Sequence, residues 1–337
     1  MIGIASQIVD RLVVLHLQML RLINGSRSSV GCRRLRLPSS ACPPPAELRE
    51  RFRALRVPRV YLARRASRKE RRQWRFHFQS PLPQGLPEND LARGSAWTHG
   101  EPGEHPAVIV LHGWMMSHFR SLYPAASAFF HAGCDVYFLE LPHHMHRKQP
   151  GTYSGECFFG SKGECGVRSL LQSVFDTAAF LRWLRHQGTP GVALYGVSLG
   201  GTVGLTCSCY SAEADLVIAV APACCLNELP TRSLLVRKLL KPVSRSAESL
   251  ALEAVDPWYL KPLLPPDRLL FVVGKKDLIV PSALAVRLAE RWGNVRVLAY
   301  RLGHITLNAA RKVRQDVVRI AAQRLQEVLQ AKEASVA

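Results

Sequence analysis

Four short segments of the chain carry groups that together could attack an acyl carbonyl. Ser198 lies in Gly-Val-Ser-Leu-Gly and is followed along the chain by Asp277 and His304. Earlier in the chain, His112-Gly113-Trp114 ends an apolar run. A serine nucleophile, a histidine base, a carboxylate that orients the histidine and backbone amides that bind the oxyanion are the parts of acyl transfer through a serine. The order of these segments favours that chemistry.

The segment around Ser198 has the pattern of a nucleophile elbow. Residues 192–195 form a short apolar run that predicts a strand, and apolar side chains recur at helical spacing after Gly200. A strand, a sharp turn and a helix form the context that such a serine requires. Gly196 and Gly200, two positions either side of Ser198, are small enough for the strand and helix backbones to meet there. The following helix N-terminus favours negative charge beside Ser198.

The oxyanion-binding amides are predicted from a second strand end. Residues 106–111 form an apolar run that ends at His112-Gly113. The loop after such a strand supplies one oxyanion amide in many hydrolases, and the residue after the nucleophile supplies the other. We therefore predict that the backbone N–H groups of Leu199 and Trp114 form the oxyanion hole. We interpret His112 as a residue that shapes this loop.

Asp277 follows a predicted buried strand over residues 267–274, and His304 follows the next predicted strand, over residues 295–300. A carboxylate at the carboxyl end of a strand can accept a hydrogen bond from Nδ1 of the base histidine and stabilise the imidazolium. Asp215 and Asp256 are competing acids, but neither follows a strand end as closely. An alternative role for Asp277 is to stabilise the turn before the next helix, and both roles are compatible.

These residues and their order resemble the α/β-hydrolase superfamily over residues 74–330. The resemblance implies a mostly parallel eight-stranded sheet with helices on both faces, a triad of Ser198, His304 and Asp277, an acyl-enzyme intermediate and no cofactor. Bacterial hydrolases that carry an extended segment before the sheet are similar in outline, and residues 75–80 and 91–97 would then form the leading antiparallel pair. One departure is the oxyanion segment, which reads His-Gly-Trp-Met where many lipases and esterases have His-Gly-Gly-Gly.

The substrate that this resemblance implies is a small molecule with an acyl group, most simply a carboxylic ester. Peptidase, thioesterase and acyltransferase reactions use the same set of residues and stay open as alternatives. A non-catalytic scaffold of the same fold is a further alternative. A fold alone does not name a substrate.

Two segments are candidates for the walls of the substrate site. Residues 224–264 are expected to form a small helical cap, with apolar helical patterns over 234–240 and 250–255. The other segment follows the predicted strand at 136–141 and reads His-His-Met-His-Arg. Because neighbouring residues of one loop rarely converge on one ion, we predict that these histidines hold no metal. The candidate pocket residues are His112, Met115, His143, His144, Trp258 and Tyr259.

The chain begins with a basic segment. We assign residues 1–71 to a helical extension, 72–330 to the hydrolase domain and 331–337 to a tail. Residues 1–80 hold 18 Lys and Arg against 4 Asp and Glu, in a chain of net charge +20. Because no nucleic-acid-binding motif accompanies this charge, we expect no nucleic-acid partner. Residues 1–24 predict a helix too short in its apolar core to span a bilayer, which leaves peripheral membrane contact, packing on the domain or dimerisation as alternatives.

The chain has nine cysteines, with no CxxC pair at metal-binding spacing. An odd number of cysteines favours a reducing compartment, so we predict a cytoplasmic protein, with membrane association as an alternative. Cys157 and Cys165 flank a glycine-rich loop, and we expect them to remain unpaired.

Overall fold

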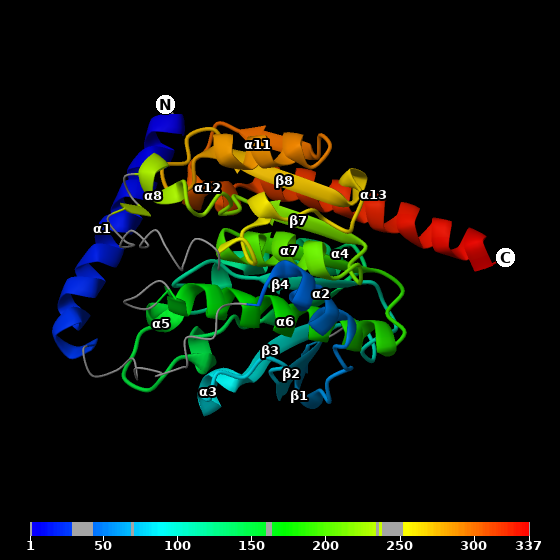
Figure 1. The fold of residues 1–337 in the computed structure, drawn as a ribbon. Helices are drawn as coiled ribbons and strands as arrows, with labels where there is room; N and C mark the ends of the chain where they lie inside the picture. Colours follow the sequence, from blue (N-terminus) through cyan, green and yellow to red (C-terminus); the bar gives the residue numbers. More distant parts are fainter. Residues whose placement is uncertain are drawn as a thin grey trace.

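A nine-stranded sheet runs through the protein (Figure 1). The computed structural model describes residues 2–28, 43–68, 71–159, 164–233, 236–237 and 252–336. The strand order is β1-β2-β3-β5-β4-β6-β7-β8-β9. The strands are β1 (Tyr61–Arg68), β2 (Arg71–Gln79), β3 (Leu91–Thr98), β4 (Ala107–Leu111), β5 (Asp135–Leu139), β6 (Val192–Val197), β7 (Leu216–Val220), β8 (Leu269–Gly274) and β9 (Arg296–Tyr300).

The strands from β5 to β9 in this order are parallel, whereas β1, β2 and β3 join the sheet as antiparallel neighbours. The predicted pair at 75–80 and 91–97 corresponds to β2 and β3 and is confirmed. The sheet has one strand more than the eight expected, because β1 pairs with β2. This strand lies in the segment assigned to the extension. Its arginine-rich sequence lacks a regular apolar alternation, and pairing with β2 supplies its extended form.

Helices cover both faces of the sheet and bury its central strands, which read as continuous apolar runs for that reason. One apolar core contains side chains of α2 (Pro45–Arg53), α6 (Glu164–His186), α7 (Leu199–Tyr210) and α11 (Ser282–Arg291). The other core contains side chains of α4 (Tyr123–His131), α12 (His304–Ala309) and α13 (Arg311–Val336). The short helices are α3 (Pro87–Asp90), α5 (Glu156–Phe159), α8 (Leu229–Arg232), η1 (Arg120–Leu122), η2 (Met145–Arg147), η3 (Pro257–Tyr259) and η4 (Pro266–Arg268).

The first helix, α1 (Ile2–Ser28), continues past the stop predicted at Asn24-Gly25. It lies along one side of the protein, at the left of Figure 1, and contacts α12. Across the described ranges, no helix has a stretch that is both long and apolar enough to cross a bilayer.

Two expectations concern segments that the structure describes only in part. The cap helices predicted at 234–240 and 250–255 lie mostly outside the described residues, and the described side chains of this region, such as Leu229, Val255 and Leu260, join the core. Cys157 is disulfide-bonded, so the expectation that it stays unpaired is wrong. The physical reason is that α5 packs closely against α6, where a Cβ on Gly166 would lie 2.8 Å from the Phe159 ring. The side chain of its partner lies outside the described residues.

Candidate active site

Ser198 lies at the turn between β6 and α7, with φ 54° and ψ −115°. This backbone conformation is strained for a residue with a side chain, and tertiary contacts hold it. The Ser198 amide donates to the Val220 carbonyl of the neighbouring strand over 2.8 Å. A Cβ on Gly196 would lie 2.2 Å from the Gly200 carbonyl oxygen, and a Cβ on Gly200 would lie 2.2 Å from the Leu111 carbonyl oxygen. The turn therefore requires both glycines.

His304 and Asp277 form a buried pair at the carboxyl ends of β9 and β8. His304 Nδ1 lies 2.7 Å from Asp277 Oδ2, and the two side chains are 8% and 2% exposed. The other carboxylate oxygen, Oδ1, accepts the amides of Ile279 and Val280 at 2.8 and 2.7 Å. Asp277 thus stabilises its own turn and orients the imidazole at the same time, which joins the two roles left open by the sequence.

The surroundings of His304 raise its pKa above the ordinary value. Burial alone lowers the pKa, but the charge of Asp277, its hydrogen bond and the charge of Asp10 together outweigh burial. A histidine held in this way keeps Nδ1–H directed at the carboxylate. Its Nε2 is then the nitrogen that can exchange a proton with another group.

A second carboxylate, Asp10 of α1, binds both loops that carry this pair. Its Oδ2 accepts the amides of His304 and Leu278 at 2.9 and 3.2 Å, and its Oδ1 accepts the amide of Ile305 at 3.0 Å. A Cβ on Gly303 would lie 2.7 Å from Asp10 Oδ2, so glycine permits this close approach. Burial raises the pKa of Asp10, and its backbone hydrogen bonds partly oppose that effect. The sequence does not indicate this role of Asp10, because no local pattern links it to positions more than 260 residues away.

The segments around Ser198 and His304 meet at the same edge of the sheet. The Tyr195 hydroxyl in β6 donates to Asn308 Oδ1 in α12 over 3.2 Å. On the other side, a Cβ on Gly113 would lie 3.6 Å from the Ser198 Cβ. The elbow, the histidine helix and the loop after β4 therefore converge at the carboxyl ends of the parallel strands, where open α/β sheets bind ligands.

The loop after β4 is held by the loop after β5. The Met115 amide donates to His144 Nε2 over 3.1 Å, and the Trp114 indole N–H donates to the Gly155 carbonyl over 2.9 Å. Met115 has a positive φ of 63°. The Trp114 amide therefore belongs to a loop that the Trp114 side chain and the Met115 amide hold in place. Leu199 is the first residue of α7, and its amide is one of those that a helix leaves without an internal partner.

His112 and His144 are fully buried and serve this loop as neutral side chains. His112 Nδ1 donates to the Gly113 carbonyl, and its Nε2 accepts the Leu141 amide at 3.0 Å. His144 Nδ1 donates to the Pro142 carbonyl, and its Nε2 accepts the Met115 amide. Burial lowers the pKa of His112 to about 4 and that of His144 well below its ordinary value. Both imidazoles are therefore occupied on both nitrogens.

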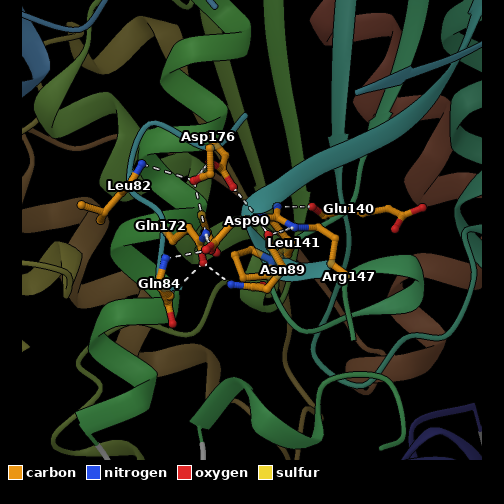
Figure 2. A network of polar contacts seen from close by, with 12 residues as sticks. Leu82, Gln84, Asn89, Asp90, Glu140, Leu141, Arg147, Gln172 and Asp176 are labelled. Atoms are coloured by element: carbon orange, nitrogen blue, oxygen red, sulfur yellow. Dashed lines mark hydrogen bonds and ion pairs between the residues drawn. The ribbon is translucent and has the colours of Figure 1, made fainter. Parts of the chain in front are cut away.

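A buried polar network underlies these loops (Figure 2). Arg147 is fully buried and pairs with Asp176 of α6 at 2.8 Å. It also donates to the backbone carbonyls of Asn89 and Glu140. The Asn89 side chain accepts the His143 amide at 2.9 Å and donates to Gln172 Oε1 at 2.7 Å. The network joins the β2–β3 connection, α6 and the histidine loop, and no sequence pattern indicated it.

The three histidines of this loop face different groups. His143 is buried beside Arg147. Burial, and to a smaller extent the positive charge of Arg147, lowers the pKa of His143 to about 4. His146 binds Glu140, with Nδ1 2.8 Å from Oε1. Within the described ranges, no three His, Cys, Asp or Glu side chains are grouped so that they could hold a metal ion.

The remaining sequence candidates lie away from the pair. The Trp258 ring packs under Arg287 and Arg291 of α11, and the Tyr259 hydroxyl accepts a bond from Asn227. Their described contacts include none with the triad candidates. The competing acids are structural: Asp256 accepts the amides of Cys225, Leu226 and Trp258, and Asp215 accepts the Val192 amide at the opposite end of β6.

Comparison with solved structures identifies the fold. An acetyl xylan esterase from Paenibacillus sp. R4 matches at 16% identity with a TM-score of 0.62, over 81% of this chain and 93% of that chain. Acetyl xylan esterase 1 from Thermoanaerobacterium sp. JW/SL YS485 matches at 16% identity with a TM-score of 0.59, over 87% and 98%. The chain has the α/β-hydrolase fold. An S-formylglutathione hydrolase from Agrobacterium tumefaciens, at 15% identity and a TM-score of 0.53, covers 78% of this chain and 98% of that chain.

No protein-family model and no curated protein matches the chain. The α/β-hydrolase fold is therefore established by its shape, and the prediction of this fold class from the sequence is confirmed. In an α/β-hydrolase fold, the elbow after β6 and the acid and histidine after β8 and β9 occupy neighbouring positions at one sheet edge. The described geometry of Ser198, Asp277 and His304 has this arrangement.

Proposed function

We propose that this protein is a serine hydrolase that cleaves carboxylic esters. The observation that carries the proposal is the buried 2.7 Å contact between His304 Nδ1 and Asp277 Oδ2, on loops that meet the Ser198 elbow. This contact fixes the imidazole with Nε2 as its basic nitrogen. A scaffold without catalysis has no need of a strained serine, an oriented histidine and a buried carboxylate together.

The reaction follows from these groups. Ser198 Oγ attacks the acyl carbonyl carbon while His304 Nε2 takes its proton. The amides of Leu199 and Trp114 bind the oxygen that becomes negative, an interaction worth about 3 kcal/mol for each donor. The carbon–oxygen bond to the alcohol then breaks as His304 returns the proton to that oxygen. Water, deprotonated by His304, releases the acid from Ser198, and the proton passes back to the serine.

An ester is favoured over the other acyl substrates by the names of the similar structures, two acetyl xylan esterases and an S-formylglutathione hydrolase. These names support a short acyl group bound to oxygen, with a thioester as the second candidate. Nothing comparable favours a peptide or an acceptor other than water. The preference is measurable with p-nitrophenyl esters of increasing acyl length and matched thioesters.

The decisive experiment is covalent labelling with a fluorophosphonate probe and identification of the modified peptide by mass spectrometry. We expect label on Ser198 that disappears in Ser198→Ala. Ser127→Ala is a matched control, because the Ser127 hydroxyl also lies beside a histidine, 3.3 Å from His131 Nδ1, but on an ordinary helix. This variant is expected to label as the wild type does. A folded wild-type protein that takes no label would reject the proposal.

A further inference from the structure

Helix α1 places a mixed face toward the protein and an apolar face outward. Among its residues up to Met19, the buried ones are Ser6, Asp10 and Val14. The outward face is an apolar stripe, defined by side chains whose exposed fractions all exceed one half: Ile4 at 68%, Ile8 at 51%, Leu12 at 58%, Leu15 at 53% and Met19 at 52%. Other exposed large apolar side chains of the described residues are scattered over several elements.

Such exposure is unusual for the apolar side chains of a helix packed on a globular protein. Residues three and four positions apart share one face of a helix, so the apolar stripe is continuous over about four turns. A surface helix ordinarily buries such a stripe in the core. Here the hydrogen bonds of Asp10 to the loops of the active site fix the opposite face inward. The described residues therefore leave the apolar stripe uncovered.

The net positive charge of the protein favours an anionic partner over a second copy of the chain. The chain carries a net charge of +20, and Arg11 is exposed next to the apolar stripe. Two copies of this chain that met through their stripes would repel each other, whereas an anionic lipid surface would attract each copy. Helices that lie in a membrane interface combine an apolar face with flanking basic residues. We propose that the apolar stripe of α1 docks this protein on an anionic lipid surface.

Docking through this stripe brings the candidate active site to the lipid. Asp10, on the inner side of α1, binds the His304 amide directly, so one helix of about 10 Å diameter separates the stripe from the histidine loop. If the proposed function also holds, the esters closest to Ser198 in the docked state are those of membrane lipids. The docking itself does not depend on that function.

The test is co-sedimentation of the full chain with vesicles of phosphatidylglycerol and phosphatidylcholine in equal parts. We expect the wild type to sediment with these vesicles and to bind vesicles of phosphatidylcholine alone more weakly. The variant Ile8→Gln/Leu12→Gln/Leu15→Gln should lose about tenfold or more in partitioning, because glutamine keeps the helix and removes the apolar face. Raising the salt concentration should weaken the wild-type binding as well.

A matched control is Leu263→Gln, because Leu263 has the same 53% exposed fraction as Leu15 but lies in the loop before η4. This control should sediment as the wild type does, and all three proteins should keep the same melting temperature and fluorophosphonate labelling. The proposal is overturned if the wild type stays in solution, or if the triple variant sediments equally well. It is also overturned if light scattering finds that the wild type is a dimer and the triple variant is a monomer. No readout requires ester turnover, so failure here leaves the proposed hydrolase untouched.

Discussion

At the scale of single residues, three buried histidines at one sheet edge differ in what their ring nitrogens face. His112 and His144 receive a backbone N–H on Nε2, which leaves no lone pair there for a proton. His304 instead faces the Asp277 carboxylate through Nδ1. Burial favours the neutral ring in all three, and only at His304 do neighbouring carboxylates, those of Asp277 and Asp10, outweigh this effect. Of these three, His304 is therefore the side chain arranged to accept and return a proton.

The pH dependence of the reaction follows from that arrangement. The base must be neutral to take the Ser198 proton, so kcat/KM should rise with pH as His304 loses its proton and then reach a plateau. Because the surroundings raise the pKa of His304, the midpoint of the rise should lie above about 6.5, the ordinary value for histidine. A pH profile measured with a p-nitrophenyl ester checks this. A midpoint below that value would contradict the assignment of His304 as the base.

Asp277→Asn tests the orienting role of the carboxylate. The amide keeps the size of the side chain but presents a neutral group to the imidazole, so the imidazolium loses its stabilising charge. We expect kcat to fall by about 10⁴-fold, the effect of the equivalent change in other triads. Asp267→Asn is the control. Asp267 is exposed just before β8, the strand that Asp277 follows, and the kcat of this variant should not change. An equal loss in both variants would show that the effect is not specific to the pair.

At the scale of elements, α1 contacts the loops that carry the candidate acid and base. Asp10 joins the loop after β8 to the start of α12, which are the two segments that carry the acid and the base. Gly303, which precedes α12, lies so close to α1 that an added Cβ would meet the α1 backbone. Helix α1 thus holds together the two segments that carry Asp277 and His304, the proposed acid and base.

Asp10→Asn should change both the rate and its pH dependence. The negative charge of Asp10 contributes to the raised pKa of His304, so its removal should move the rise of kcat/KM to lower pH. The side-chain NH2 of asparagine would also face one of the backbone N–H groups that the carboxylate accepts, and two donors repel each other. The resulting displacement of the loops should lower kcat by about tenfold or more. Glu50→Gln, on the exposed face of α2, should alter neither quantity. A lower kcat without a shift in pH would restrict Asp10 to a structural role.

At the scale of the whole molecule, the network around Arg147 joins distant parts of the chain beneath the site. It connects α3, the loop after β5 and α6, and all of its main members are buried (Figure 2). Burial raises the pKa of Asp176, while the charge of Arg147 opposes that effect. Buried charges of this kind stabilise a protein only as a complete set.

Arg147→Met should therefore destabilise the protein by about 3–5 kcal/mol, because it leaves the Asp176 carboxylate buried without its partner. Urea unfolding measures the change. The double variant Arg147→Met/Asp176→Leu should be more stable than the single variant, since both charges are then absent. Arg53→Met, which breaks an exposed ion pair with Glu50, should cost under about 1 kcal/mol. If Arg147→Met lowers the free energy of unfolding no more than Arg53→Met does, the network does not stabilise the protein as described.

The sequence by itself determined the features that depend on neighbouring residues. The elbow at Ser198 requires Gly196 and Gly200 within two positions, and the apolar runs before Asp277 and His304 predicted the strands β8 and β9 that the structure has. Because parallel strands present their carboxyl ends at one edge, the fold class and the candidate acid and base followed from chain order alone.

Only the tertiary structure decided the features that depend on contacts between distant residues. Asp10 binds amides 268 to 295 positions away, and no sequence period reaches that far. The outward direction of the apolar stripe depends on those bonds, since helical spacing defines a face but not what it meets. The burial of Arg147 and the pairing of β1 likewise depend on neighbours supplied by the fold. A local pattern fixes which chemical groups a segment carries, and packing decides which of them meet.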